Sequence, residues 1–222
     1  ERVVVLAGGV GGSTFVRGVR EAYPDAEVTV IGNTADDITL HGLRICPDLD
    51  TMMYRLGGGA ADARGWGRAD ESWGVRAELE AYAGTVPDEL PTWFSLGDRD
   101  LATHLVRTSL LAAGQPLSTV TQALCARWLA NDPRLRLLPM TDQPVETHVV
   151  IADPSRPGGR RRVHFQEYWV RLHAEPDALG VVRAGIEDAR PAPGVLEAVT
   201  AADLVLLAPS NPVVSIGPIL AV

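Results

Sequence analysis

The chain has 222 residues, of which 46% are hydrophobic, so it can bury the core of one large domain or of a core domain with an inserted lobe. Its net charge of −8 argues against nucleic acid as a partner, and its one basic run, residues 160–162, is too short to form a binding stripe. No apolar run is long enough to span a bilayer and no signal-like segment opens the chain, so we expect a cytoplasmic protein without membrane contacts.

All 20 basic residues are arginine. The lack of lysine excludes a Schiff-base or P-loop lysine, and it leaves arginine as the only permanent side-chain cation for anionic ligands. The two cysteines, Cys46 and Cys125, lie far apart and in no metal-ligand spacing. This pattern is typical of reduced thiols and argues against a disulfide scaffold or a zinc site.

Residues 2–7 form a near-continuous apolar run, which predicts a strand that is buried on both faces in a parallel sheet. The sequence Gly-Gly-Val-Gly-Gly follows at residues 8–12 and leads into a helical pattern through Val19. A strand, a glycine loop and a helix together make a phosphate-binding unit, because the helix N-terminus offers free N–H groups to an anion. A tight turn without a ligand is the alternative interpretation.

Two familiar versions of this unit fit the residues badly. A Walker loop needs a lysine before its Ser or Thr, and Gly12 stands there instead. A dinucleotide fingerprint ends in glycine and has an acidic residue after the second strand. Here the fingerprint ends in Thr14, and the second predicted strand, residues 28–31, runs into Gly32-Asn33-Thr34. A standard ATPase and an NAD-dependent oxidoreductase are therefore disfavoured.

The stretch from residue 33 to residue 51 is rich in carboxylates, and we expect the chain to be organised around it. It carries Asp36, Asp37, Asp48 and Asp50 after an apolar strand. Crowded carboxylates repel one another unless a cation, an arginine or hydrogen bonds offset the charge, and Mg²⁺ takes oxygen ligands of this kind. The alternative is that these residues cap helices and close turns, with Asp50 as the N-cap of a helix over residues 51–56.

The middle of the chain mixes helical and β patterns. Trp66 and Trp73 flank a polar stretch that is either a mobile flap or a surface loop, a helix is predicted over residues 72–83, and residues 87–91 form a linker. Residues 93–100 indicate a strand end followed by a helix start, where Asp98 and Arg99 either contact a ligand or only staple the turn. A helix over residues 117–129 has Ser118 as its expected cap.

The last third returns to β structure and then to the sheet. Short strands are predicted at residues 137–142 and 145–152, with a hairpin across residues 157–159. A helix over residues 194–201 and a strand over residues 204–208 are followed by a polar loop, where open α/β sheets place ligands. The fold class is therefore α/β: a Rossmann-like parallel sheet with a large α+β insertion. A sheet that closed at residue 222 would be small, so we expect a C-terminal part to be missing.

The chain resembles the 2-phospho-L-lactate transferase family of coenzyme F-420 biosynthesis, in order along nearly its whole length. The motifs that carry the resemblance are the glycine loop at residues 8–12, Asn-Thr-Ala-Asp-Asp at 33–37, Ile-Cys-Pro-Asp-Leu-Asp-Thr at 45–51, Leu-Gly-Asp-Arg-Asp-Leu-Ala-Thr-His at 96–104, Leu-Pro-Met-Thr-Asp at 138–142, His-Phe-Gln-Glu at 164–167, and Ser-Asn-Pro with Ser-Ile-Gly-Pro at 210–218.

The resemblance implies an enzyme that moves a phosphoenolpyruvyl or 2-phospholactyl group from a guanosine-diphosphate-linked donor to the ribityl hydroxyl of the deazaflavin Fo. GMP is released, Mg²⁺ is the cofactor, and a homodimer is expected. The arginine-rich, alanine-rich composition suggests a GC-rich actinobacterial source and hence the enolpyruvyl donor. By the same resemblance, residues 1–50 form the nucleotide-binding part of the core, residues 51–190 an inserted lobe with the acceptor pocket, and residues 191–222 the return to the core.

Position by position, the resemblance assigns a role to each matching residue. Asp50 is expected beside the Fo hydroxyl as the catalytic residue. The other acceptor contacts implied are Ser95, Asp98, Arg99 and His104. The nucleotide contacts implied are Gly8, Gly9, Gly11, Gly12, Asn33, Ser210 and Asn211. The metal ligands implied are Asp50 together with Asp36 or Asp37, and the sequence leaves open which of the two binds.

The main rival is a non-catalytic regulator that binds a nucleotide or nucleotide-sugar. A related family of bacterial regulators resembles the chain in its glycine loop and its Ala-Asp-Asp segment at residues 35–37. Those regulators have Gly-Gly-Ser-Ser-Gly after the aspartates, whereas residues 38–42 here read Ile-Thr-Leu-His-Gly and lead to Pro-Asp-Leu-Asp. This difference favours the transferase.

Overall fold

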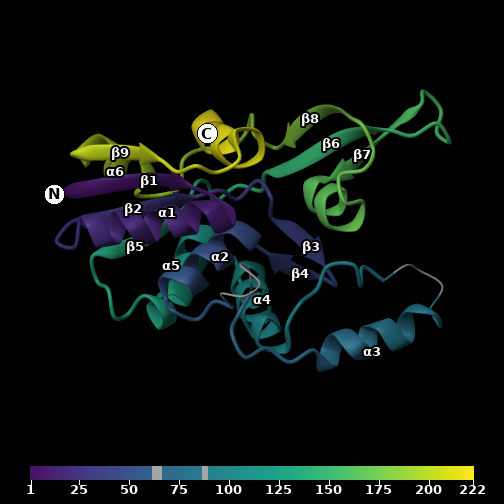
Figure 1. The fold of residues 1–222 in the computed structure, drawn as a ribbon, viewed down its shortest axis with the longest axis horizontal. Coiled ribbons are helices and arrows are strands. Elements are labelled where there is room, and N and C mark those ends of the chain that lie inside the picture. Colours follow the sequence, from purple (N-terminus) through teal and green to yellow (C-terminus); the bar gives the residue numbers. More distant parts are fainter. Residues whose placement is uncertain (62–66, 87–89) are drawn as a thin grey trace.

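The computed structural model describes residues 1–61, 67–86 and 90–222 and has a parallel sheet of four strands at its centre (Figure 1). The strand order is β5-β2-β1-β9, with β5 at Leu135–Pro139, β2 at Glu27–Gly32, β1 at Arg2–Ala7 and β9 at Leu204–Leu207. All three pairings are parallel. The α/β class with a parallel sheet, predicted from the apolar run at the N-terminus, is confirmed.

Both faces of β1 are buried, as a continuous apolar strand requires. Val3 and Val5 pack into one hydrophobic cluster, whereas Val4 and Leu6 pack into another on the opposite face. The first cluster includes residues of α1 (Gly9–Ala22), α2 (Pro47–Leu56) and α5 (Leu117–Trp128). The second includes residues of α6 (Val195–Ala201), η2 (Pro212–Ile216) and α7 (Gly217–Ala221). The sheet is thus covered on both sides.

Two further β units flank the carboxyl ends of the central strands. A small hairpin joins β3 (Ile38–Leu40) to β4 (Leu43–Ile45) and packs near α4 (Asp98–Ala112). The helix α3 (Gly74–Ala83) lies beyond α4, at the lower edge of the molecule in Figure 1. An antiparallel sheet of order β7-β6-β8 carries the turn η1, with bounds β6 Glu146–Ala152, β7 Arg160–His164, β8 Ala178–Ala184 and η1 Glu167–Arg171. The predicted hairpin across residues 157–159 is confirmed.

The segment 51–190 does not lie wholly outside the core. Its strand β5 pairs with β2 in the central sheet, and α5 packs against that sheet. The β6–β8 sheet, α3 and α4 of the same segment stand beside the core (Figure 1). The chain therefore leaves the core after α2 and returns to it for α5 and β5. It leaves again for β6, β7 and β8 and returns to the core at α6.

Several local expectations were wrong for identifiable reasons. The helix expected at residues 51–56 begins at Pro47, because proline suits the first helical turn. The residues before α4, expected as a strand end, are irregular. The N-cap of α5 is Pro116 rather than Ser118. The N–H and the hydroxyl of Ser118 both donate to Asp142. The expected flap around Trp66 and the linker at 87–91 fall partly outside the described residues.

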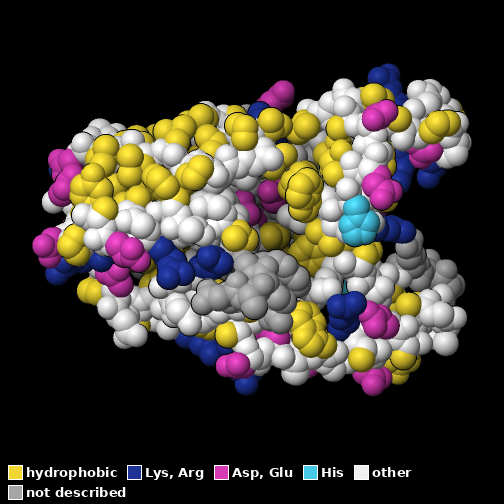
Figure 2. All heavy atoms as spheres, in the orientation of Figure 1, with side chains coloured by type: hydrophobic (Ala, Val, Ile, Leu, Met, Phe, Trp, Pro, Cys, Tyr) yellow, Lys and Arg dark blue, Asp and Glu magenta, His cyan; other side chains and the backbone are white. Residues whose placement is uncertain are grey.

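Among the described helices, none combines the length and the apolar character needed to cross a membrane. Apolar side chains do gather on one outer face, over β9 and the C-terminal segment (Figure 2). Exposed apolar residues of these elements are Val205 and Leu207 on β9 and Leu220 on α7. β9 is also an edge strand, since only β1 pairs with it among the described strands.

Candidate active site

A cavity of about 510 Å³ opens at the carboxyl ends of β1, β2 and β9. Its wall combines the glycine loop, the aspartate-rich segment before and within α2, the start of α4, the turn η1 and the loop after β9. This position is where open parallel sheets bind ligands, because the loops after neighbouring strands converge there. The size is in the range of sites for small-molecule ligands.

The glycine loop and the loop after β9 are joined by two hydrogen bonds. The Gly8 N–H donates to Ser210 Oγ at 3.1 Å, and the Ser210 hydroxyl donates to the Gly8 carbonyl at 2.8 Å. A Cβ on Gly8 would lie 2.5 Å from Asp48 Oδ2, so only glycine fits there. Gly9 has a φ of +63°, which favours glycine as well. The helix α1 starts directly after this turn, with its first N–H groups at the cavity.

Of the residues expected at the nucleotide, Gly8, Gly9, Gly11, Ser210 and Asn211 line the cavity. Gly12 is packed behind the wall instead, because a Cβ there would meet Ser210 Oγ at 2.7 Å. Asn33 is fully buried behind the wall; its amide donates to Asp48 Oδ2 at 2.9 Å, and its oxygen accepts from the Ala35 N–H. Asn33 thus positions a cavity carboxylate.

Asp36 and Asp48 line the cavity beside the glycine loop. Burial, followed by the charges of Asp48 and Asp37, raises the pKa of Asp36 well above its ordinary value. Burial raises the pKa of Asp48 to about 6, although hydrogen bonds from Asn33 and the Gly9 N–H act in the opposite direction. Asp36 Oδ1 is buried without a hydrogen-bond partner among the described residues. Two carboxylates in this state are suited to sharing a cation.

Asp37 points elsewhere. It is absent from the cavity wall among the described residues, and its carboxylate lies 3.5 Å from the Arg44 guanidinium. Burial raises its pKa to about 7 against the opposing charge of Arg44. The expected metal set of Asp36, Asp37 and Asp50 is therefore not gathered at one point of the cavity.

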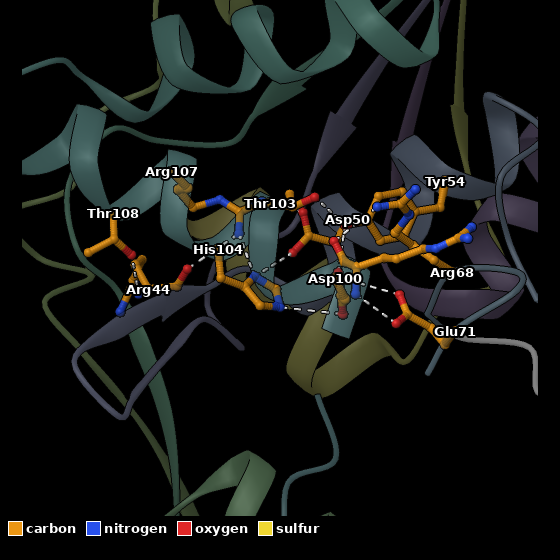
Figure 3. A network of polar contacts seen from close by, with 11 residues as sticks. Arg44, Asp50, Tyr54, Arg68, Glu71, Asp100, Thr103, His104, Arg107 and Thr108 are labelled. Atoms are coloured by element: carbon orange, nitrogen blue, oxygen red, sulfur yellow. Dashed lines mark hydrogen bonds and ion pairs between the residues drawn. The ribbon is translucent and has the colours of Figure 1, made fainter. Parts of the chain in front are cut away.

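Asp50 is the centre of a polar network between α2 and α4 (Figure 3). Its carboxylate forms an ion pair with the buried guanidinium of Arg107, and its second oxygen lies 3.6 Å from His104 Nδ1. His104 Nε2 lies 3.4 Å from Asp100 Oδ2, and Asp100 Oδ1 accepts from the Tyr54 hydroxyl at 2.6 Å. The network joins two helices across the floor of the cavity.

Asp50 is not a helix cap. It is the fourth residue of α2, and its N–H already donates to the Cys46 carbonyl within the helix. Burial raises the pKa of Asp50, whereas the Arg107 charge lowers it. Burial also opposes ionisation of Asp100, but the hydrogen bond and charge of His104 outweigh it and hold the pKa of Asp100 below its usual value. The structure removes the capping interpretation of Asp50.

Ligand atoms of Asp50, Asp100 and His104 all lie within 4.8 Å of one another, a spacing that fits a metal ion. Asp50 Oδ2 is buried without a hydrogen-bond partner in the described structure, and the nearest carboxylate oxygen given for the buried His104 Nε2 is Asp100 Oδ2, at 3.4 Å. The two carboxylates supply the oxygen ligands that Mg²⁺ and Mn²⁺ prefer, whereas an imidazole is more typical of transition-metal sites. Among the described residues, no arginine lines the cavity, and the Arg107 guanidinium meets Asp50 and His104 from behind its wall.

The residues expected at the acceptor divide into two groups. Ser95 and His104 line the cavity. Asp98 instead accepts hydrogen bonds from the Gly74 and Val75 N–H groups at 2.9 and 3.0 Å, so it caps α3. Arg99 does not line the cavity in the described structure; its N–H donates to Glu71.

Sequence reasoning missed Tyr54, Asp100, Arg107 and Trp169. Asp100, His104 and Arg107 are spaced by four and three residues, so they share one face of α4, and that spacing was the available signal. Tyr54 lies four residues after Asp50 on α2. No comparable periodic signal marks Trp169, which lies on η1 and lines the cavity.

Comparison with known proteins gives concordant matches. The sequence model of the family described as "2-phospho-L-lactate transferase CofD" matches residues 3–222. Curated relatives named "Phosphoenolpyruvate transferase" are 60% identical in Streptomyces avermitilis, 61% in Streptomyces coelicolor and 58% in Nocardia farcinica, each over 100% of this chain. The chain spans 66%, 66% and 64% of those proteins, about two thirds of their length.

Two crystal structures of one Bacillus halodurans protein, which is described as a member of the UPF0052 family, also match. Their TM-scores are 0.60 and 0.61, with 19% and 17% sequence identity. Each match covers 100% of this chain and 63% of the other. At this identity the likeness shows a shared fold alone.

Proposed function

The chain belongs to the 2-phospho-L-lactate transferase CofD family, and we propose that it transfers a phosphoenolpyruvyl group from a guanosine-diphosphate-linked donor to the ribityl hydroxyl of the deazaflavin Fo. GMP is the second product, and the pathway is coenzyme F-420 biosynthesis. The name of the relatives supports phosphoenolpyruvyl over 2-phospholactyl as the group that is moved. The observation that carries the proposal is one cavity that holds a phosphate-type loop, a carboxylate centre and an aromatic wall.

The diphosphate of the donor binds at the glycine loop. Gly9, Val10 and Gly11 at the start of α1 line the cavity, and the positive end of the helix dipole favours an anion there. Ser210 fixes the loop from the other side through its two bonds to Gly8, and Asn211 extends the same wall. Gly12 and Asn33 act from behind by keeping the loop and Asp48 in position.

The acceptor hydroxyl is oriented by Asp50. Its Oδ2 has no hydrogen-bond partner among the described residues, and the residue lines the cavity beside Ser95 and His104. A carboxylate held in this way can accept a hydrogen bond from an alcohol and take its proton as the oxygen attacks phosphorus. Arg107 holds the other oxygen of Asp50, so the carboxylate is fixed for this task.

A divalent cation, Mg²⁺ in our proposal, completes the site. Asp50, Asp100 and His104 would hold it, and Asp36 with Asp48 offers a second carboxylate pair beside the glycine loop. When bound, such an ion neutralises charge on phosphoryl oxygens and lowers the pKa of a coordinated hydroxyl. The wall needs it, because the described lining carries aspartates and no arginine to meet a diphosphate.

The test is a reaction of the purified protein with Fo, the enolpyruvyl-diphospho-guanosine donor and Mg²⁺, with products identified by mass spectrometry. We expect GMP and the phosphoenolpyruvyl ester of Fo in equal amounts. A protein that binds guanosine diphosphate but releases no GMP under these conditions would instead be the non-catalytic regulator considered from the sequence. The shared fold with the Bacillus halodurans protein does not distinguish the two, since it carries no information on chemistry.

A further inference from the structure

The cavity has an aromatic end to whose residues the proposed function has not yet assigned separate roles. Trp169 on η1 lines the cavity and is 60% exposed. This fraction is large for an aromatic side chain of that size, which proteins usually bury. The ring of Phe165 lies against Trp169, with centroids 6.2 Å apart and an angle of 23° between the planes. Phe165 lines the cavity as well. The two rings form a stacked pair of which Trp169 is the open member.

The turn that carries Trp169 is firmly anchored. Phe165, Tyr168 and Leu172 pack against the buried face of the β6–β7 sheet. The Tyr168 hydroxyl donates to the carbonyls of Ala174 and Pro176 at 3.3 and 3.2 Å. With its neighbours fixed in this way, the turn contributes Trp169 and Val170 to the cavity wall, and Trp169 is the aromatic one. The turn is π-helical, a conformation that is rare in proteins.

A third aromatic residue reaches the same cavity from a different part of the chain. Phe94, which precedes α4, lines the cavity and packs with the cluster around Ile38 and Leu96. Its ring meets Trp93 edge-on, with centroids 5.8 Å apart. Ser95 follows Phe94 in the sequence and lines the cavity as well. The aromatic end is therefore lined by two segments, η1 with Phe165 and the residues before α4, and it belongs to the same cavity as Asp50.

From this geometry we propose that Trp169 is the stacking platform for the fused heteroaromatic ring of the acceptor, with Phe165 behind it and Phe94 on the facing lobe. The inference rests on the proposed function and adds the residue that selects a flat acceptor. A planar ring on Trp169 covers the exposed indole and directs the ribityl chain toward Asp50. The glycine loop, on the other side of the carboxylates, keeps the nucleotide.

The experiment compares Trp169→Leu, Trp169→Phe and a control, Tyr82→Leu. Tyr82 is an aromatic residue on α3 that is 59% exposed and does not line the cavity. The fluorescence anisotropy of Fo measures its Kd, and calorimetry measures the Kd of guanosine diphosphate. Stacking of a base on an aromatic side chain contributes enough to predict a rise of about tenfold or more in the Fo Kd for Trp169→Leu. Trp169→Phe should recover most of the loss, and Tyr82→Leu should bind as the parent does.

Two further readouts separate stacking from a general effect on the cavity. Trp169→Leu should leave guanosine diphosphate binding unchanged and should raise KM for Fo while keeping kcat at saturating Fo. An Fo Kd within twofold of the parent overturns the inference but leaves the proposed function standing. Equal weakening of Fo and guanosine diphosphate also overturns it. A parent protein that binds guanosine diphosphate but no Fo overturns both the proposed function and this inference.

Discussion

Asp50 of α2 and Arg107 of α4 form an ion pair in the interior, where the Arg107 side chain is 2% exposed and the Asp50 side chain 7%. Arg107 also donates to the Arg44 carbonyl and contacts His104 Nδ1 at 3.1 Å. The attraction to Asp50, which outweighs the cost of burial, raises the pKa of Arg107, so the guanidinium stays charged. The charge that fixes Asp50 therefore comes from behind the cavity wall.

This pair predicts a large coupling energy. Asp50→Asn or Arg107→Met leaves one buried charge without its partner, which costs about 3–5 kcal/mol in the free energy of unfolding. The double variant should lose much less than the sum of the two. Urea unfolding of all four proteins measures the coupling. The exposed pair Arg76 and Glu80 on α3 is the control, with an expected coupling of about 0.5 kcal/mol. Additive losses at Asp50 and Arg107 would contradict a structural ion pair.

Substitution in the glycine loop should weaken nucleotide binding. In Gly11→Val the new Cβ meets the Pro209 carbonyl at 3.2 Å, and its methyl groups extend into the space where the diphosphate is proposed to bind. We expect at least about a tenfold rise in the Kd of guanosine diphosphate, the effect of losing about 1.4 kcal/mol of binding. Gly18→Val is the matched control, because a Cβ at Gly18 of the same helix meets nothing within 4 Å. Equal affinity of both variants, measured by calorimetry, would remove the loop from the site.

Divalent cations should bind at Asp50, Asp100 and His104. We expect His104→Gln to raise the Kd of Mn²⁺ by about tenfold or more, on the scale found for residues that support metal sites. His148→Gln is the control, since His148 lies on β6 beside Glu146 and does not line the cavity. Calorimetry with Mn²⁺ in the presence of guanosine diphosphate gives both values. In the same enzyme, EDTA should abolish turnover and Mg²⁺ restore it; full turnover without metal would refute the dependence.

Stability should depend on pH through His164. Burial lowers its pKa to about 4, and the charges of His148 and Arg44 act in the same direction against Glu146 and the Asp37 carbonyl. Its Nδ1 accepts from the Gln166 N–H, and Nε2 lies 3.1 Å from the Asp37 carbonyl, so a second ring proton would break a hydrogen bond. The unfolded chain, with an ordinary pKa of 6.5, binds more protons between pH 6.5 and 4. The stabilisation from His164 is therefore complete above pH 6.5 and is lost as the pH falls to 4.

The variant His164→Gln isolates this effect, because glutamine can accept and donate as the neutral ring does. The shift in pKa corresponds to about 3 kcal/mol for a fully buried ring, and we expect about 2 kcal/mol because the ring is partly exposed. Chemical unfolding at pH 7.5 and pH 4.5 should show the parent losing that much more stability than the variant. Parallel pH profiles of the two proteins would place the titration elsewhere. His41→Asn, at an exposed turn with positive φ, is the control.

The sequence predicted the features that follow from chain-local rules. The apolar run of β1 and the glycines after it indicated a buried parallel strand and a loop at its carboxyl end, and the structure places Ser210 beside Gly8 because β9 is parallel to β1. The capping interpretation of Asp50 failed because proline at residue 47 starts the helix four residues earlier than expected. Both outcomes depend on local backbone preferences, one recognised and one overlooked.

The partners that lie far apart in sequence were beyond reach. Asp98 follows a pattern typical of a helix start, but its acceptor atoms are used by α3, which sequence alone could not place beside it. From the sequence, Arg107 is expected to be an ordinary surface residue of a helix. Its role follows only from the contact with Asp50 of α2 in the folded protein. Trp169 gives no periodic signal at all. These roles depend on contacts between segments that lie far apart in the sequence. Such contacts are set by tertiary packing rather than by local propensity.

The acidic wall has a consequence for the speed of encounter. In the described structure, Asp36, Asp48, Asp50 and Asp100 line the cavity, and the guanidiniums of Arg44 and Arg107 lie behind it. An anionic nucleotide that arrives without its cation meets a repulsive field, which dissolved monovalent salt screens over a distance of about 8–10 Å. Association of the free nucleotide should thus become faster as ionic strength rises, the reverse of the slowing found for clefts lined with basic residues, whereas a nucleotide already complexed with Mg²⁺ should show a weaker response.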